Sequence, residues 1–348
     1  MTTTPTVLEH EDLADPAEPA PLGRGSLFRA EAHRFSSRRF IRWLLLLSVV
    51  GYLIAMPLIA VTQFSKPNAG VLEDAQRKMD QVVAEQEQFR EQCLNDPQRP
   101  SDVPVEEVCG PEFSSGDLRL SDFIDTPPFE LAQALPTGAI AVGVATAMLA
   151  FLIGATFVGA EWSSRSMVAL LFWEPRRLKV MGVKIAVTAL FAALLGVVTQ
   201  AVWWGTAEVI ARTRGDRDNL PADFWSDLFG QQGRAVLFVV LTALLGFGIA
   251  NLIRNTAAAL GAGFVYLVII ENLVRGFFPT WQQWLLVENV SGLLSRDGHT
   301  VFIYENDPFG DGVREVLISN VRGGLVLGIL TAVIVVIGVL LFKRRDLH

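Results

Sequence analysis

The two cysteines, Cys93 and Cys109, are the residues whose type and spacing most directly indicate a defined chemistry. No other cysteine occurs in the 348 residues, and these two lie 16 positions apart in one polar stretch. In an oxidising compartment two such thiols form a disulfide. Closing a loop of this length is worth about 3 kcal/mol in the chain-entropy model. We therefore predict a disulfide, with two unrelated thiols as the alternative.

A carboxylate and a guanidinium one helical turn apart, Glu271 and Arg275, form the second candidate site. Glu271 follows an uncharged run of 16 residues, which places it at the membrane edge if that run is a span. Residues at positions i and i+4 of a helix are neighbours, so we predict an ion pair that anchors the helix end. A role in substrate binding or gating is the alternative.

Other patterns that carry chemistry are absent from the sequence. The four histidines are far apart and no Cys/His cluster accompanies them, so no metal site is predicted. The HExxH, GxSxG and GxxxxGK[ST] patterns do not occur, and a chain without the last of these has no phosphate-binding loop of its own. We expect no catalytic residue and no cofactor on this chain.

Long uncharged runs determine the fold class. The chain is 51% hydrophobic and 19% charged, whereas an average soluble domain has about 25% charged residues. Six runs of 16 to 30 residues contain no ionisable side chain, and about 20 apolar residues suffice for a membrane-spanning helix. The runs are continuously apolar rather than alternating, which excludes a barrel. An all-α polytopic membrane protein with six spans is predicted, and this excludes a soluble enzyme, a nucleic-acid binder and a disordered scaffold.

Basic residues predict the orientation of the spans. With both termini in the cytoplasm, 15 bases fall in short inner segments with few acids, whereas 14 bases spread over the longer, acidic outer segments. Basic residues crowd the cytoplasmic side of membrane proteins. We therefore expect a multi-pass protein of the cytoplasmic membrane with both ends inside.

The predicted outer segment between the first two spans contains a helical repeat. Mostly apolar residues recur at spacings of three and four, with Gln86 as the polar member: Leu72, Ala75, Met79, Val82, Gln86, Phe89 and Cys93. Such a seam predicts an amphipathic helix packed on its own loop domain. An intermolecular coiled coil is the alternative. The later outer segment, with Trp281 and Trp284, resembles an interfacial or re-entrant helix.

Two cytoplasmic segments are amphipathic. Phe28, Ala32 and Phe35 share a face among basic residues, which predicts a helix on the anionic inner leaflet. The loop after the second span combines apolar residues at helical spacing with charges, which predicts a helix that docks on a cytoplasmic partner. A membrane-surface helix without a partner is the alternative. The candidate docking residues are Glu161, Trp162, Arg165, Met167, Leu170, Leu171, Glu174, Arg176 and Arg177.

A family resemblance joins these segments. The stretches Gly159-Ala160-Glu161-Trp162 and Glu174-Pro175-Arg176-Arg177 after a second span, the basic amphipathic segment before the first span, and the closing Phe342-Lys343-Arg344-Arg345-Asp346 resemble the permease subunit of bacterial type-2 ABC exporters. The 24 Arg against 5 Lys indicate a genome of high GC content, and an actinobacterial source is expected. The resemblance implies an inner elbow helix, six spans and a first inner loop that couples to an ATPase.

The predicted segments follow from the spans and the resemblance together. They are a disordered acidic tail 1–23, an elbow helix 24–42, TM1 43–65, an extracytoplasmic loop domain 66–135, TM2 136–160, a coupling loop 161–179, TM3 180–207, an outer loop 208–234, TM4 235–253, an inner turn 254–256, TM5 257–275, an outer loop with re-entrant or interfacial helices 276–322, TM6 323–342 and a cytoplasmic tail 343–348.

The expected function is that of a permease subunit in an ABC transporter that exports its substrate. ATP and Mg²⁺ would bind a separate ATPase chain, and a second permease chain, identical or related, would complete the transport path within membrane lipid. No nucleic-acid partner is expected. The alternative is a membrane-anchored signalling or scaffold protein, in which the 66–135 domain binds a ligand and the helices transmit a change of shape.

Overall fold

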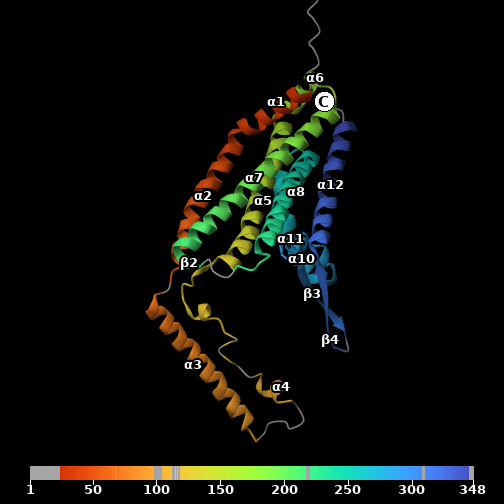
Figure 1. The fold of residues 1–348 in the computed structure, drawn as a ribbon. Coiled ribbons are helices and arrows are strands. Elements are labelled where there is room, and N and C mark those ends of the chain that lie inside the picture. The colour runs from red at the N-terminus through yellow and green to blue at the C-terminus, as the bar shows by residue number, and fades with distance from the viewer. Residues whose placement is uncertain are drawn as a thin grey trace, which may run out of the picture.

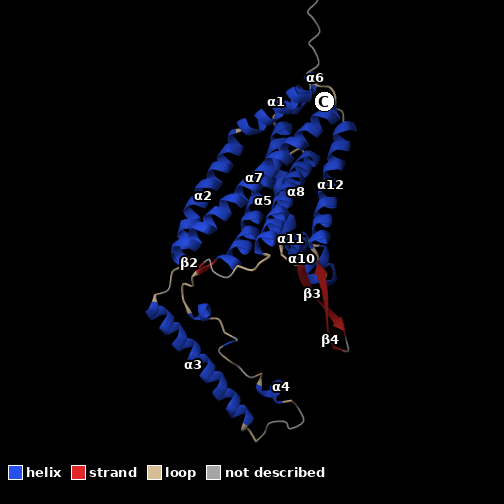
Figure 2. Cartoon of the chain, viewed as in Figure 1, coloured by secondary structure: helices blue, strands red, loops and turns tan. Residues whose placement is uncertain are grey.

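The structure is a computed structural model that describes residues 24–344, apart from 67, 98–103, 112–113, 115, 117, 217–219 and 308–309. The predicted acidic tail 1–23 and residues 345–348 of the predicted C-terminal tail lie outside the described residues. The described chain is mainly helical, with two small sheets (Figures 1 and 2).

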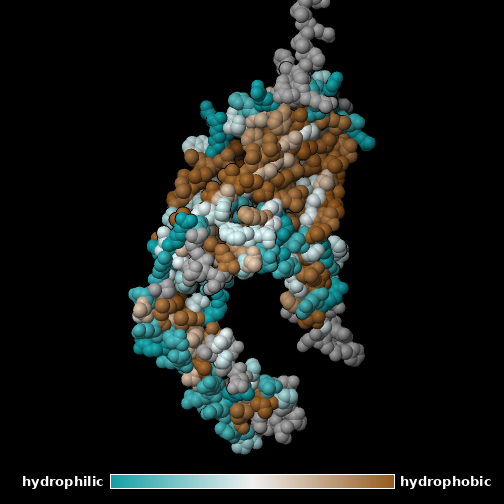
Figure 3. All heavy atoms as spheres, viewed as in Figure 1, coloured by the Kyte–Doolittle hydropathy of each residue, from teal (hydrophilic) through white to brown (hydrophobic). Residues whose placement is uncertain are grey.

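Six helical segments are long and apolar enough to cross a membrane, in agreement with the sequence prediction. They are α2 (Arg39–Gln63), α5 (Leu131–Ser163), α7 (Arg177–Arg214), α8 (Phe224–Ile253), a composite fifth span (Thr256–Phe277) and α12 (Asn320–Arg344). The fifth span consists of α9 (Thr256–Val265), a π-helical turn η3 (Tyr266–Ile270) and α10 (Glu271–Phe277). On the face that Figure 3 shows, hydrophobic residues form a broad band over the bundle, with hydrophilic residues at both ends.

The two ends of the bundle carry different elements, and we name them accordingly. At the terminal end α1 begins, α12 ends, the short helix α6 (Ser166–Trp173) lies between α5 and α7, and α8 connects to the fifth span; the loop end carries the other connections between spans (Figure 1). Because the chain crosses the bundle six times, an even number, the first span begins and the last span ends at the same end.

Helices α5 and α8 form the centre of the bundle, and glycine lets their backbones approach. A Cβ on Gly154 would lie 2.1 Å from the carbonyl oxygen of Ala243, and a Cβ on Gly246 would lie 2.4 Å from that of Phe151. Small residues of this kind allow close helix packing where no water drives the helices together. Span α2 lies at the periphery, with most of its apolar side chains exposed.

Helix α1 (Arg24–Ser37) ends just before span α2, and Arg38 separates the two helices. The ring of Phe35 stacks on that of Phe191 and meets Phe157 edge-on, with centroid distances of 4.5 and 4.9 Å. Phe28 and Ala32 pack against the same buried cluster. The apolar face that we expected to rest on lipid therefore packs on the bundle, because α7 and α5 offer it an apolar surface.

The segment between the first two spans forms a lobe at the loop end. It contains α3 (Ala69–Leu94), α4 (Val105–Cys109) and a 3-10 turn η2 (Leu120–Phe123). The disulfide between Cys93 and Cys109 joins α3 to α4, with the Cα atoms 5.7 Å apart, as predicted. Ala75 and Met79 of the predicted seam are buried, and the Asn68 side chain caps the helix by accepting the Val71 N–H.

The segment before the last span contains a β-hairpin that we did not predict. After η4 (Pro279–Trp284) and α11 (Leu286–Leu294), strands β3 (His299–Asp307) and β4 (Gly310–Ile318) pair antiparallel. One face of the hairpin buries Val301, Ile303 and Ile318. Elsewhere at this end, β1 (Phe129–Glu130) pairs parallel with β2 (Gly215–Asp216). The strands are coloured red in Figure 2.

Candidate functional site

A buried network of charges lies at the terminal end, where α1, α5 and α7 meet. Lys184 contacts Glu31 at 2.6 Å and Glu161 at 2.7 Å, and Arg38 contacts the other carboxylate oxygen of Glu161 at 2.7 Å. Arg34 also reaches Glu31, at 3.3 Å. The side chains of Lys184 and Glu31 are fully buried. The network fastens the amphipathic helix α1 to two spans at once.

Aromatic and backbone groups complete the surroundings of this network. Lys184 Nζ lies 4.9 Å, and the Arg38 guanidinium carbon 5.2 Å, from the centroid of the Phe157 ring, within the range of cation–π attraction. Arg38 also donates to the carbonyl of Thr156 at 3.2 Å. Buried charges are costly unless they are paired and hydrogen-bonded, and in this network each charge has an opposite charge within contact distance.

Trp162, the next residue after Glu161, contacts a different group of helices, which includes α8 and α12. Its indole N–H donates to Asn251 Oδ1 of α8 at 3.1 Å, and the guanidinium carbon of Arg254 lies 4.6 Å from its ring centroid. Its ring also meets that of Phe342 of α12 edge-on at 5.8 Å. Consecutive helical residues point about 100° apart, so Glu161 and Trp162 contact different sets of spans.

Gly159 adds the fifth span to these contacts. A Cβ at this position would lie 2.3 Å from Thr256 Oγ1, so α5 and the start of α9 touch where only glycine fits. We name Gly159, Glu161 and Trp162 the α5 junction. Through these three residues the last turn of α5 contacts side chains or backbone of α7, α8, α9 and α12, and Arg38 just before α2, while α1 is joined to Glu161 through Lys184.

Helix α6 follows the junction, and its apolar residues differ in exposure. Arg165 takes the left-handed conformation (φ 55°) that turns the chain from α5 into α6. Met167 and Leu170 are buried, and Leu171 packs against the same core cluster. We had expected these three residues to anchor a partner, but the turn at Arg165 directs them into the bundle. Among the described side chains of α6, Phe172 is the most exposed apolar one, at 85%, and it is the one we consider for a partner.

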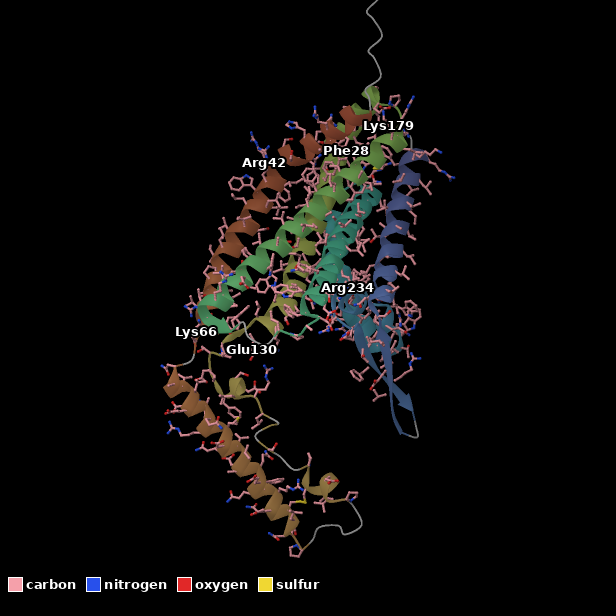
Figure 4. All side chains as sticks on the ribbon, in the orientation of Figure 1. Phe28, Arg42, Lys66, Glu130, Lys179 and Arg234 are labelled. Atoms are coloured by element: carbon pink, nitrogen blue, oxygen red, sulfur yellow. A yellow bond between two sulfur atoms is a disulfide. The ribbon has the colours of Figure 1, made fainter. Side chains whose placement is uncertain are left out.

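Ion pairs and hydrogen bonds of charged side chains hold the segment between α6 and α7. Lys179 contacts Glu174 at 2.6 Å, and its hydrogen bond holds the pKa of the Glu174 carboxyl below the ordinary value. Arg177 donates to the carbonyls of Phe342 and Lys343 at the end of α12, which suits a cation at a helix C-terminus. Arg176 is exposed beside them. Lys179 is labelled at this end in Figure 4.

The second predicted site, at the loop end, has different partners from those expected. Glu271 is buried and accepts the N–H of Val287 at 3.0 Å, in the first turn of α11. In the described part of the chain Arg275 pairs instead with Glu288, at 2.7 Å, and His299 of the hairpin reaches the same carboxylate at 3.0 Å. The predicted Glu271–Arg275 ion pair is therefore wrong, because the first turn of α11 offers each side chain a better partner.

At the C-terminal end of α11, side chains of α8 and α12 donate hydrogen bonds to the free backbone carbonyls. Arg234 and Gln231 of α8 donate to the carbonyls of Leu293 and Leu294 at 2.9 and 3.1 Å. Asn320, at the start of α12, donates to the carbonyl of Gly292 at 2.8 Å. An anion at the N-terminus and a cation at the C-terminus both favour the helix dipole. Figure 4 labels Arg234 on α8 beside this region. Three spans thus hold one short helix by its two ends.

We expect a double-mutant cycle to assign the partner of Arg275. Arg275→Gln and Glu288→Gln remove one ion pair between them, so their effects on the free energy of unfolding should show a coupling of about 1 kcal/mol. The matched cycle of Arg275→Gln with Glu271→Gln should show a smaller coupling, because Glu271 bonds to the backbone of α11. Denaturant unfolding of the purified protein in detergent provides the values. A larger coupling in the second cycle would restore the original prediction.

Sequence reasoning missed the residues that complete both sites. The sequence pattern uses Arg38 and Lys184 only as bases that orient the spans and assigns no role to Glu31, although Lys184 lies well inside α7. Its signal was available: a lysine seven residues beyond the start of a spanning helix needs a partner. Arg234 and Asn320 carry no local signal, because their acceptors are backbone carbonyls of a helix far along the chain.

Together the two sites show what the arrangement can do. The charged groups of both sites connect helices to one another. No family model, curated protein or solved structure matches this chain.

Proposed function

We propose that this chain is the permease subunit of an ABC transporter of the cytoplasmic membrane, acting as an exporter. ATP and Mg²⁺ bind a separate ATPase chain, which docks on α6 at the terminal end. That end, where α1 begins and α12 ends, faces the cytoplasm, in keeping with the basic residues that flank the spans there. A second permease chain completes the transport path.

One observation carries this proposal: α6 presents an exposed aromatic side chain directly after the α5 junction. Phe172 is available for a partner, while Met167 and Leu171 fix α6 to the core of the bundle. A force applied to α6 therefore reaches Glu161 and Trp162, and through them the ends of the other spans. A permease that takes its energy from a partner needs such a connection between its docking surface and its transmembrane helices.

The sequence supplies a second argument. The chain contains no GxxxxGK[ST] pattern, so energy for uphill transport has to come from another subunit. α1, which we assign as the elbow helix, lies beside the same end and is joined to the α5 junction by the charge network. The apolar faces of α2 and of the fifth span are the least covered within the chain, and lipid or the second permease chain covers them in the membrane.

Substitution of Phe172 tests the docking surface. Phe172→Asp is expected to lower the amount of ATPase that copurifies with the chain by about tenfold or more, because truncating a central aromatic anchor commonly costs over 1.4 kcal/mol. The variant should still insert and fold, since Phe172 packs little against its own chain. Quantitative mass spectrometry of the affinity-purified membrane complex measures both.

Phe302→Asp provides the matched control. Phe302 is also an exposed phenylalanine, but it lies on the hairpin at the loop end, and its substitution should leave ATPase recovery unchanged. If wild-type complexes contain no ATPase chain, or if both variants retain it equally, the exporter proposal fails.

The rival function, a signalling or scaffold protein, has its own supporting observation. The lobe formed by α3 and α4 projects from the loop end, and a disulfide fixes its two helices (Figure 1). A ligand-binding domain would be built in this way. Deleting the lobe separates the two functions: an exporter retains its ATPase partner, whereas a ligand-transmitting scaffold loses its partner at the loop end.

A further inference from the structure

An open cavity of about 430 Å³ lies at the terminal end, between α1 and α6. Arg34, Ser37 and Arg38 line it from α1 and the residue that follows, Glu161 lines it from the end of α5, and Ser166, Ala169 and Leu170 line it from α6. The Glu161 carboxylate in this wall contacts both Arg38 and Lys184. Its volume lies within the range of roughly 300–1,000 Å³ typical of small-ligand sites. Helices α1 and α6 thus share a pocket whose lining combines apolar surface with charged and hydroxyl side chains.

The charges around this cavity favour an anion. Lys184 meets the carboxylates of both Glu31 and Glu161, and Arg38 also contacts Glu161. With Arg34 the group has three cations against two anions, which leaves one positive charge. The Arg34 side chain is 49% exposed and meets Glu31 only at 3.3 Å. It therefore has N–H groups to offer to a ligand, and the hydroxyls of Ser37 and Ser166 lie in the same walls.

The position of the cavity indicates the kind of anion. Arg38 lines the cavity and immediately precedes span α2. The apolar side chains of Phe40, Trp43 and Leu47 are exposed along the first turns of that span. An anion carrying acyl chains could place its phosphate in the cavity and its chains against α2. A water-soluble phosphate has the same charge but makes no use of this apolar surface.

We propose that this cavity binds the phosphate-bearing headgroup of an anionic phospholipid, such as phosphatidylglycerol. The headgroup contacts Arg34 and the two serine hydroxyls, and it bridges α1 to α6. The bound lipid would thereby fix the amphipathic helix against the loop that contains Phe172. This site depends only on the placement of the spans in a membrane and does not depend on the exporter function.

Native mass spectrometry of the full-length chain, released from nanodiscs that contain equal amounts of phosphatidylglycerol and phosphatidylcholine, tests the proposal. The wild-type chain should retain phosphatidylglycerol in preference to phosphatidylcholine. Arg34→Gln should weaken this retention about tenfold, the effect of losing one hydrogen bond between charged groups. Arg29→Gln is the matched control, because Arg29 is exposed on the same helix and does not line the cavity. Its substitution should change retention less than about twofold.

A second variant makes the test independent of the Arg34–Glu31 contact. Ala169 also lines the cavity and is exposed, so Ala169→Glu brings a carboxylate to the headgroup without removing any contact of the charge network. It should abolish the preference for phosphatidylglycerol, whereas Ala169→Gln, of similar size, should weaken it less.

Three results would overturn the proposal. Equal losses for Arg29→Gln and Arg34→Gln would show diffuse attraction of lipid to a basic surface. Displacement of the lipid by millimolar inorganic phosphate would identify a site for the free anion. A photo-reactive residue at position 169 that cross-links to a protein in native membranes, and not to lipid, would identify a protein-docking site.

Discussion

Replacing Lys184 by methionine is expected to lower the free energy of unfolding by about 3–5 kcal/mol, the usual cost of removing one partner from a buried ion pair. The substitution leaves Glu31 and Glu161 buried without the cation that contacts both of them. Methionine fills most of the space of the lysine stem, so the loss measures charge rather than volume. Denaturant or thermal unfolding in a fixed detergent provides the value.

Two further variants make this expectation specific. Lys343→Met removes an exposed lysine at the end of α12 and should change the free energy of unfolding by no more than about 0.5 kcal/mol. Lys184→Met combined with Glu31→Leu removes both members of the fully buried pair, while Arg38 continues to neutralise Glu161. The double variant should recover much of the lost stability. A Lys184→Met protein as stable as the wild type would show that the network does not hold α1 in place.

Removal of the disulfide is expected to loosen the lobe and leave the six spans intact. Cys93→Ser combined with Cys109→Ser abolishes a closed loop of 16-residue separation, which corresponds to about 3 kcal/mol of local stability in the chain-entropy model. The amides of α3's last turns and of α4 should therefore exchange with deuterium much faster. The amides of α5 and α8 should keep their protection from exchange, because the disulfide joins two helices of the lobe and does not connect the lobe to the spans.

Reduction of the wild-type protein should reproduce the effect of the double substitution. A reductant applied to the double variant should do nothing further, which controls for other actions of the reagent. If peptides covering residues 94–110 exchange equally in the oxidised, reduced and substituted proteins, the disulfide does not stabilise the lobe.

The spans were predictable because each follows from the residues of one continuous segment. The disulfide was predictable because the sequence contains only two cysteines. An uncharged run of about 20 residues has few alternatives to a spanning helix, and two cysteines without competitors leave one possible pair. The hairpin has a local signal of another kind: residues 300–304 form a run of β-branched and aromatic side chains, and glycines follow at Gly310 and Gly312. Such a short run has no period of its own, so it does not distinguish a strand from a short apolar helix.

The sites were predictable only in part, because sequence periodicity shows which residues share a face and not what covers that face. Met167 and Leu170 are apolar at helical spacing, and the same pattern serves a core or a docking surface. The turn at Arg165 decides between them. Glu31 and Lys184 are 153 positions apart, and nothing local connects them. The family resemblance drew attention to Glu161 and Trp162, but their partners appear only when the spans are packed.

The α5 junction also constrains how the length of this chain can vary. Gly154 fixes α5 against α8 by a close backbone contact, and Glu161 and Trp162 follow on the same uninterrupted helix. One inserted or deleted residue between them would rotate the last turn by about 100°. Glu161 would then leave Lys184, and Trp162 would leave Asn251. Related chains can therefore change side chains along this stretch more readily than they can change its number of residues, whereas the lobe between α2 and α5 is free to grow or shrink.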